Sequence, residues 1–289
     1  MNVETTKPRE AAGGAPAENG PPPIEVKGLT MSYGPLIVME ELSFQVERGE
    51  IFVIMGGSGS GKSTLLKHLI GLRAPAKGSI LFEGEDFLEA DERTRKGILQ
   101  RMGVLYQNGA LWSGLTLAEN VALPLEEYTE LDARSIGEVV SLKLALVGLR
   151  GFEDFYPAEI SGGMRKRAAL ARATALDPDV LFFDEPSSGL DPITASRLDD
   201  LILQLRDSFG TTIVIVSHDL ASIFKVADRA IFLDIKEKTM TAVGAPDSLR
   251  DHPPSDEVRR FMTRSSAIDP SAGSSTQRDS EAPNRRDEP

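Results

Sequence analysis

The chain has 289 residues, no cysteine and a net charge of −12 at pH 7, because 44 acidic side chains outnumber 32 basic ones. This length accommodates one large domain or two small ones. The lack of cysteine excludes disulfides, thiolate metal sites and a cysteine nucleophile, and the acidic balance argues against a general nucleic-acid binder. The apolar runs are far shorter than the roughly 18–20 residues of a membrane-spanning helix, and no basic cluster leads into an apolar stretch near Met1. We therefore expect no membrane span, no secretory signal peptide and a cytoplasmic location.

Both ends of the chain have compositions typical of disorder. Residues 1–23 are rich in Gly and Pro and lack aromatic side chains, and residues 264–289 are dominated by Ser, Pro, Asp and Arg. Neither segment carries enough apolar surface to offset the entropy that is lost on ordering. We expect a disordered leader over 1–23 and a disordered tail over 264–289, with the folded protein between them.

Apolar patterning between these ends indicates an α/β protein. Residues 24–26 and 42–46 alternate like half-buried strands. Continuous apolar runs, which are typical of parallel strands covered by helices on both faces, occur at 51–55, 180–183 and 213–216. Helix formers predominate over residues 91–175, and this stretch indicates a helical subdomain inserted in the α/β core.

A glycine-rich segment follows the first continuous run. Residues 56–63 read Gly-Gly-Ser-Gly-Ser-Gly-Lys-Ser, and the helix-like segment 64–72 comes next. Backbone N–H groups of such a loop and the start of the following helix bind phosphate. We expect Lys62 to contact the β and γ phosphates of a nucleotide, and the Ser63 hydroxyl to coordinate Mg²⁺. The predicted nucleotide-binding residues are Gly56, Gly57, Ser58, Gly59, Ser60, Gly61, Lys62, Ser63 and Thr64.

Two acidic residues follow the apolar run at 180–183. Asp184 and Glu185 stand where a parallel sheet presents its ligands. Mg²⁺ prefers oxygen ligands and keeps several waters, so one carboxylate can serve the metal while its neighbour polarises the attacking water. We assign Asp184 to the metal and Glu185 to the general base.

A third motif, Ser161-Gly162-Gly163-Met164, precedes a helical pattern over 166–175. With Ile160 before it, the motif resembles the Leu-Ser-Gly-Gly-Gln signature of the ATP-binding-cassette (ABC) ATPases, with Ile in place of Leu and Met in place of Gln. The resemblance covers roughly residues 24–250. It implies a P-loop NTPase (RecA-like) core with an antiparallel β subdomain and a helical subdomain at about 91–175. A short C-terminal helix is expected over 251–263.

Four further residues match positions of functional residues in that family. The resemblance implies that Tyr33 stacks on adenine and that Gln107 senses the Mg²⁺ and the attacking water and helps to hold the metal. It places Asp191, in Ser188-Gly189-Leu190-Asp191, in the loop along a dimer contact. The resemblance also implies that His218 is the histidine that responds to the γ-phosphate of ATP.

The resemblance also implies a mechanism and partners. ATP and Mg²⁺ are the expected cofactors, and two copies form a head-to-tail homodimer in which the signature of one contacts ATP on the other. Separate membrane permease subunits receive the resulting motion. Trp112 and its apolar neighbours Leu111, Leu115, Leu117 and Val121 lie where transporter cassettes receive a membrane subunit, but packing inside the helical subdomain explains the same pattern equally well.

Other segments narrow the resemblance to the ATPases of Mla-type phospholipid transport systems. These segments are Gln107-Asn108-Gly109-Ala110-Leu111, Leu146-Val147-Gly148-Leu149-Arg150-Gly151, residues 157–164, which contain the Gly-Gly-Met signature, residues 167–175 and Asp191-Pro192-Ile193. The resemblance implies phospholipid transport between inner and outer membranes, with an MCE-domain lipid-binding partner and a peripheral location on the cytoplasmic face of the inner membrane. The alternative is an importer of a small polar solute such as an amino acid.

Two readings from other classes are disfavoured. Cassette ATPases of chromosome and DNA-repair proteins carry a long coiled coil between the phosphate loop and the signature, and no heptad pattern occurs here. Cassettes associated with translation usually carry two modules in one chain.

The triplet Arg165-Lys166-Arg167 favours a solvated helix face over a nucleic-acid patch, because adjacent residues point in different directions around a helix. We assign no role to His68 or His252.

Overall fold

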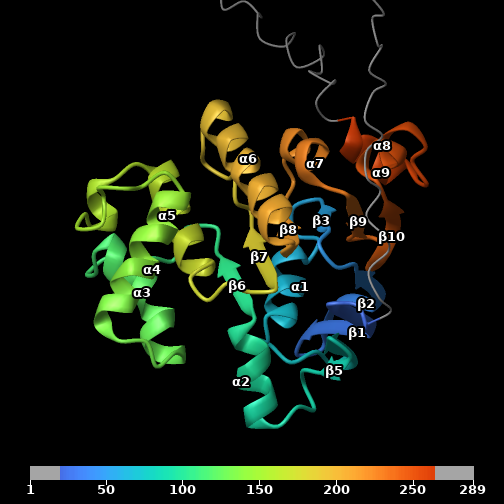
Figure 1. Ribbon diagram of the computed structural model, residues 1–289. Helices are drawn as coiled ribbons and strands as arrows, with labels where there is room; N and C mark the ends of the chain where they lie inside the picture. Colours follow the sequence, from blue (N-terminus) through green and yellow to red (C-terminus); the bar gives the residue numbers. More distant parts are fainter. Residues whose placement is uncertain (1–19, 264–289) are drawn as a thin grey trace, which may run out of the picture.

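The computed structural model describes residues 20–263 (Figure 1). Most of the predicted leader over 1–23 and all of the predicted tail over 264–289 lie outside the described residues. Two β-sheets and a set of helices make up the part that is described. None of the helices within residues 20–263 combines the length and the apolar character needed to cross a membrane.

An antiparallel sheet begins the described part, as expected for the β subdomain. Its strands lie in the order β2-β1-β4-β5, with bounds β1 (Ile24–Tyr33), β2 (Leu36–Val46), β4 (Lys77–Phe82) and β5 (Glu85–Asp86). Ile24 and Val26 point into the core, whereas Glu25, between them, accepts a hydrogen bond of 2.8 Å from Gln45 on β2. The period-2 pattern of residues 24–26 therefore reflects one buried and one more exposed face.

A six-stranded sheet forms the centre of the molecule. Its order is β10-β9-β3-β8-β7-β6; the strands from β9 to β6 run parallel to one another, and β10 pairs antiparallel with β9. The bounds are β3 (Ile51–Gly56), β6 (Met102–Leu105), β7 (Val180–Asp184), β8 (Thr212–Val216), β9 (Arg229–Asp234) and β10 (Thr239–Gly244). The three continuous apolar runs are β3, β7 and β8.

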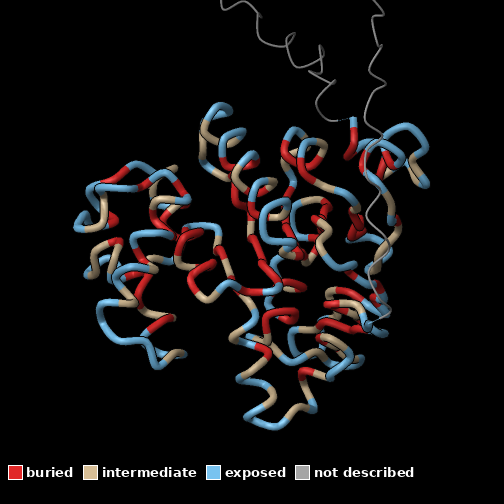
Figure 2. The backbone as a smooth tube through the Cα atoms, in the orientation of Figure 1, coloured by how far each residue is buried: buried red, intermediate tan, exposed pale blue. Residues whose placement is uncertain are grey.

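Helices and the antiparallel sheet cover the two faces of this central sheet (Figure 1). Ile51, Val53 and Met55 of β3 pack toward the helices that follow β6, whereas Phe52 and Ile54 pack toward the antiparallel sheet and α1. Burial on both faces explains why β3 is apolar throughout, and the strands form the buried centre in Figure 2.

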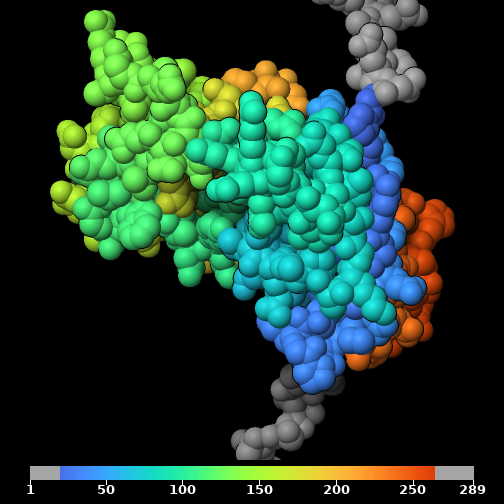
Figure 3. Space-filling view, turned by 90° about the horizontal axis from the view of Figure 1, so that it is seen from below, coloured from blue at the N-terminus to red at the C-terminus, as the bar shows by residue number. Residues whose placement is uncertain are grey.

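The helices divide between the core and a separate lobe. Their bounds are α1 (Lys62–Leu69), α2 (Glu92–Gln100), α3 (Leu117–Tyr128), α4 (Ala133–Leu146), α5 (Gly162–Ala173), α6 (Pro192–Phe209), α7 (Leu220–Val226), α8 (Pro246–Asp251) and α9 (Asp256–Met262), with a 3-10 turn at Pro157–Glu159. Helices α3, α4 and α5 form the lobe on the left of Figure 1. Seen from below, a hollow separates this lobe from the side of α2 (Figure 3).

The structure differs from the predicted subdomain boundaries. The stretch 91–175 was expected to be helical, but β6 lies within it and pairs with β7 in the central sheet. A Cβ on Gly103 of β6 would lie 2.1 Å from the carbonyl oxygen of Ala173, so the strand sits tightly against the end of α5. Near the C-terminus, α8 crosses the predicted boundary at residue 250, and α9 falls inside the helix expected over 251–263.

Candidate active site

The glycine-rich segment 56–63 joins β3 to α1 at the carboxyl edge of the central sheet. A Cβ on Gly56 would lie 2.6 Å from the carbonyl oxygen of Leu233 in β9. A Cβ on Gly61, which precedes α1 with φ 85°, would lie 2.9 Å from Val38. Both positions therefore need glycine. The first turn of α1 carries no acidic residue, so no charge in that turn opposes an anion at the start of the helix.

The Lys62 side chain lies against this loop. It is 8% exposed, and its Nζ donates hydrogen bonds of 2.9 Å to the carbonyl oxygens of Gly56 and Gly57. The Ser60 hydroxyl is buried and has no hydrogen-bond partner within residues 20–263. A buried ammonium and an unpaired hydroxyl in one loop are suited to a phosphate group.

Ser63, near the start of α1, faces the end of β7. Its hydroxyl donates to Oδ1 of Asp184 at 3.2 Å. Burial raises the pKa of Asp184, and the charge of Glu185 adds to this rise, against the opposing effects of the Ser63 hydrogen bond and nearby lysines. A bound cation stabilises the charged carboxylate. A hydroxyl and one carboxylate, with further positions open to water and phosphate, form a donor set that suits Mg²⁺.

Glu185 and His218 meet beside this pair. His218 Nδ1 lies 2.7 Å from Oε1 of Glu185, and Oε2 of Glu185 is buried without a hydrogen-bond partner in the described part of the chain. Glu185 has a φ of 50°, which is uncommon for a residue with a side chain. Its N–H donates to the carbonyl oxygen of Val216 at 2.9 Å. A carboxylate is the group that a general base uses to accept a proton, and Glu185 keeps one carboxylate oxygen without a hydrogen bond.

Gln107 and Asp191 lie on loops at the same edge of the sheet. Gln107 follows β6, and its Nε2 donates to the Ser188 hydroxyl at 3.3 Å. Asp191 caps α6, because its Oδ1 accepts from the N–H groups of Ile193 and Thr194 at 3.1 and 3.0 Å. Hydrogen bonds from Thr194 lower the pKa of Asp191. Asp191 therefore has a structural role within its own chain.

Ser161 caps α5, and its Oγ accepts a hydrogen bond of 3.3 Å from the N–H of Met164. Gly162 and Gly163 begin the helix, and a Cβ on Gly163 would lie 2.6 Å from the Thr194 methyl group. The helix α5 belongs to the helical lobe, whereas α1 lies in the core (Figure 1). One chain therefore does not bring its signature to its own phosphate loop.

Tyr33 ends β1 beside the phosphate loop. Its hydroxyl lies 3.4 Å from Oγ1 of Thr64, and its side chain is exposed. The guanidinium of Arg73 lies over the ring, 3.9 Å from its centroid, and also donates to the carbonyl oxygen of Ser32 at 2.8 Å. Arg73 therefore covers one face of the Tyr33 ring. No motif in the sequence pointed to Arg73.

Comparisons with known proteins agree with this arrangement. A family model described as "ABC transporter" matches residues 39–188. The chain is 43% identical to the Haemophilus influenzae "Intermembrane phospholipid transport system ATP-binding protein MlaF" over 78% of this chain and 85% of that protein.

The chain belongs to the ABC transporter family. It is 45% identical to the Mycobacterium leprae "Probable ribonucleotide transport ATP-binding protein mkl" over 75% of this chain and 62% of that protein. A solved dimeric ATP-binding cassette in a post-hydrolysis state, bound to ADP and Pi, is 28% identical, with a TM-score of 0.70 over 77% of this chain and 98% of that chain. The chain is thus an ATP-hydrolysing subunit with the ABC ATPase fold.

The basic triplet of this ABC ATPase forms the solvated face that its sequence favoured only in part, because Arg165 is exposed and Arg167 is half-buried, whereas Lys166 is buried. Lys166 is 7% exposed, and its Nζ donates to three carbonyl groups that follow β7. Arg165 and Arg167 donate to carbonyl groups of neighbouring loops. Each side chain donates to backbone carbonyl groups outside α5, and only Lys166 is buried in doing so.

Trp112 is exposed, in contrast to two of its apolar neighbours. Its exposed fraction is 66%, whereas Leu117 and Val121 are fully buried in the core. The backbone of Trp112 is held by the buried Asn120, which accepts from its N–H at 2.8 Å and donates to its carbonyl oxygen at 3.0 Å. Packing in the helical lobe therefore explains Leu117 and Val121 but leaves Trp112 on the surface of the ABC ATPase.

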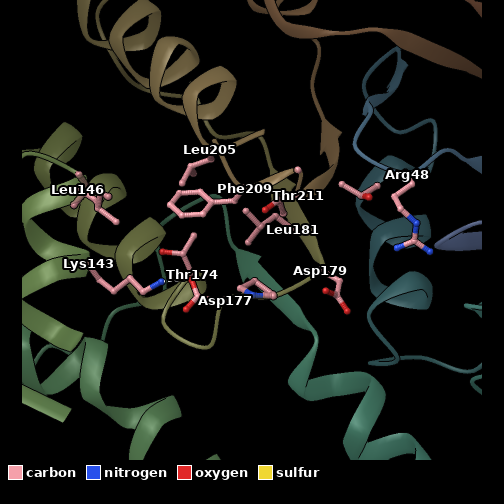
Figure 4. Close-up of a pocket in the computed structure, with 14 residues that line it drawn as sticks. Arg48, Lys143, Leu146, Thr174, Asp177, Asp179, Leu181, Leu205, Phe209 and Thr211 are labelled. Carbon is pink, nitrogen blue, oxygen red and sulfur yellow. Dashed lines mark hydrogen bonds and ion pairs between the residues drawn. The ribbon is translucent and has the colours of Figure 1, made fainter. Parts of the chain in front are cut away.

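A cavity of about 360 Å³ lies at the opposite edge of the central sheet, where β7 and β8 begin (Figure 4). Leu146, Leu205 and Phe209 contribute apolar surface, and the Lys143 ammonium at its edge is paired with Asp177. The phosphate loop, Asp184 and His218 all follow the carboxyl ends of strands. This cavity is therefore separate from the ATP site.

Proposed function

We propose that this ABC ATPase powers phospholipid transport between the inner and outer membranes of a bacterium through separate permease subunits. The main support for this proposal is the 43% identity to the Haemophilus influenzae phospholipid transport protein. The matched region covers 85% of that protein's length. The name of the Mycobacterium leprae relative refers to ribonucleotide transport, but the chain covers only 62% of that protein. We therefore give its name less weight.

In the proposed reaction, Lys62 and the amides of the phosphate loop bind the β and γ phosphates of ATP. Ser63, Asp184 and Gln107 hold Mg²⁺, which when bound supplies positive charge that neutralises the phosphates. The Glu185 carboxylate accepts a proton from the attacking water. His218 holds the other carboxylate oxygen, at 2.7 Å, and contacts the γ-phosphate.

Each ATP site is completed by a second copy of the chain. The exposed residues Ser161 and Gly162 lie at the start of α5, in the lobe away from the α1 of the same chain, and this supports a head-to-tail dimer (Figure 1). In that dimer, Ser161, Gly162, Gly163 and Met164 face the ATP on the partner, Asp191 lies in the contact loop, and Tyr33 stacks on adenine. The dimeric solved relative supports the same arrangement.

The membrane partners are a permease and an MCE-domain lipid-binding protein, and the chain works peripherally on the cytoplasmic face of the inner membrane. Three exposed aromatic side chains, Trp112, Phe155 and Tyr156, support a docking surface. Phe155 lies close to the start of α3, because its carbonyl oxygen accepts from the N–H of Leu117 at 2.8 Å. We call these three residues the aromatic surface.

Co-purification and reconstitution test this function. The full chain purified from detergent-solubilised membranes is expected to bring down a permease and an MCE-domain protein. The same complex in liposomes is expected to move a fluorescent phospholipid only when ATP is present. A permease with a soluble amino-acid-binding protein would instead support import of a small polar solute. Transport of labelled ribonucleotides would favour the activity named for the mycobacterial relative, and the absence of any membrane partner would refute all three functions.

Changing Trp112 to Ala tests the docking role of the aromatic surface. We expect ATP hydrolysis by the isolated chain to stay within about twofold, while retention of the membrane subunits falls on the order of 10-fold, because an exposed aromatic anchor contributes to binding and not to folding. Pull-down and phosphate release measure the two effects. Tyr128→Ala, at the far end of α3, is the matched control. Equal loss of hydrolysis in the isolated chain and in the complex would instead assign Trp112 to packing.

A further inference from the structure

A buried lysine connects the signature helix to the loop that carries Glu185. Lys166 lies in α5 and is 7% exposed. Its Nζ donates to the carbonyl oxygens of Glu185, Pro186 and Ser188 at 3.2, 2.6 and 2.6 Å. An ammonium group has three N–H donors, and here each one has an acceptor in the same short loop.

The cost of burying this charge indicates that the contact is specific. Removing an ammonium group from water is unfavourable unless hydrogen bonds replace its hydration. Burial lowers the pKa of Lys166, and the nearby charge of Glu185 acts in the opposite direction. Three backbone acceptors replace the hydration that the buried ammonium group of Lys166 loses.

The loop that accepts these bonds has an unusual conformation. Glu185 has a φ of 50°, and the backbone strain of a non-glycine residue in this region persists only where surrounding contacts hold it. The hydrogen bond from Lys166 engages the carbonyl group of this same residue. Ser188, the third acceptor, also receives the Gln107 hydrogen bond through its hydroxyl. Lys166 therefore holds the loop that contains Glu185 and to which Gln107 donates a hydrogen bond.

We infer that Lys166 is a positioning residue for ATP hydrolysis. It holds the 185–188 loop so that the Glu185 carboxylate faces the attacking water, and it connects this loop to the helix that begins with the signature. This inference rests on the proposed role of Glu185 as general base. Carbonyl oxygens of its own chain accept from the Lys166 ammonium, so we assign this side chain no contact with ATP. Its loss is therefore expected to lower kcat with little change in KM.

The test compares Lys166→Met with Arg167→Met in the full chain assembled with its membrane subunits. We expect Lys166→Met to lower kcat by about 10–100-fold with KM for ATP within about threefold, because a misplaced base loses transition-state stabilisation and not ground-state binding. Lys166→Gln, whose amide keeps two of the three donors, is expected to lower kcat less than Lys166→Met does, by about 3–10-fold. Arg167→Met removes hydrogen bonds from the same helix to the carbonyl oxygens of Val147 and Gly148, and we expect its kcat to stay within about threefold of wild type.

A double substitution separates positioning from a general effect on stability. If Lys166 acts through Glu185, adding Lys166→Met to Glu185→Gln leaves the residual rate unchanged, because residues that act as a unit are not additive. A further drop in the double variant, or wild-type kcat in folded Lys166→Met, would overturn the inference. If Lys166→Met does not fold, Lys166→Gln serves as the test variant in its place. A kcat that Lys166→Gln lowers in the wild-type background but not in the Glu185→Gln background supports positioning, and any other result refutes it. A normal hydrolysis rate in Glu185→Gln alone would instead refute the assignment of Glu185 as the general base. This result differs from those that would refute the role of Lys166.

Discussion

Replacing Glu185 with Gln is expected to slow ATP hydrolysis by about 10²–10⁴-fold while ATP binding is retained. Gln has nearly the size of Glu but lacks a carboxylate that can take a proton from water. Oε1 lies 2.7 Å from His218 Nδ1, and Oε2 is buried without a partner among residues 20–263. The phosphate loop is untouched by this change. Phosphate release at saturating ATP and the ATP dissociation constant measure the two effects.

A second readout of Glu185→Gln is the association of two copies. If hydrolysis separates the proposed dimer, the variant is expected to remain dimeric in ATP, as size-exclusion chromatography would detect, because ligands that are not consumed keep the bound state populated. Glu237→Gln, on an exposed turn, is the control and is expected to behave like the wild-type protein. A hydrolysis rate close to wild type in Glu185→Gln would remove Glu185 from the role of base.

Replacing Lys62 with Met is expected to weaken ATP binding on the order of 100-fold, which corresponds to about 2.7 kcal/mol. Lys62 is 8% exposed, and its ammonium lies within 2.9 Å of the carbonyl oxygens of Gly56 and Gly57. Met fills a similar volume but carries no charge for the phosphates. Hydrolysis at low ATP concentration is expected to fall in parallel, and equilibrium titration with a fluorescent ATP analogue measures the affinity.

Lys67→Met provides the matched control for this prediction. Lys67 lies in the same helix α1 but is exposed, so we expect its loss to change ATP affinity by no more than about threefold, as is typical of a screened surface charge. Thermal unfolding of both variants checks that α1 remains folded. Unchanged affinity in Lys62→Met, or an equal loss in both variants, would show that Lys62 is not a specific phosphate ligand.

Several features of the fold were predictable because they depend on local patterns. The apolar runs at 51–55, 180–183 and 213–216 predicted β3, β7 and β8, since strands covered on both faces have no polar alternation. The phosphate loop was predictable for a similar reason. Its glycines, its lysine and the following helix occupy one continuous segment, so their relation in space follows from their relation in sequence.

Two errors arose where contacts join distant segments. The strand β6 has only four residues, Met102–Leu105, within a stretch of helix formers, and it is a strand because β7 provides its pairing partner. Lys166 was expected on a solvated face, because adjacent residues point in different directions around a helix and the basic triplet therefore does not form one patch. Its burial depends on the carbonyl groups of the 185–188 loop, which no pattern within α5 reveals.

The sequence by itself determined that this chain is an α/β ABC ATPase with a phosphate loop, an acidic pair and a signature, because each motif is a short segment whose chemistry is complete in its own residues. Only the tertiary structure decided which of these residues meet. Parallel pairing of β3, β7 and β8 places Ser63, Asp184, Glu185 and His218 at one edge of the sheet. The same packing puts the signature in a separate lobe, covers one face of Tyr33 with Arg73 and turns Lys166 inward. Such contacts depend on the packing of whole elements, which spacing along the chain does not encode.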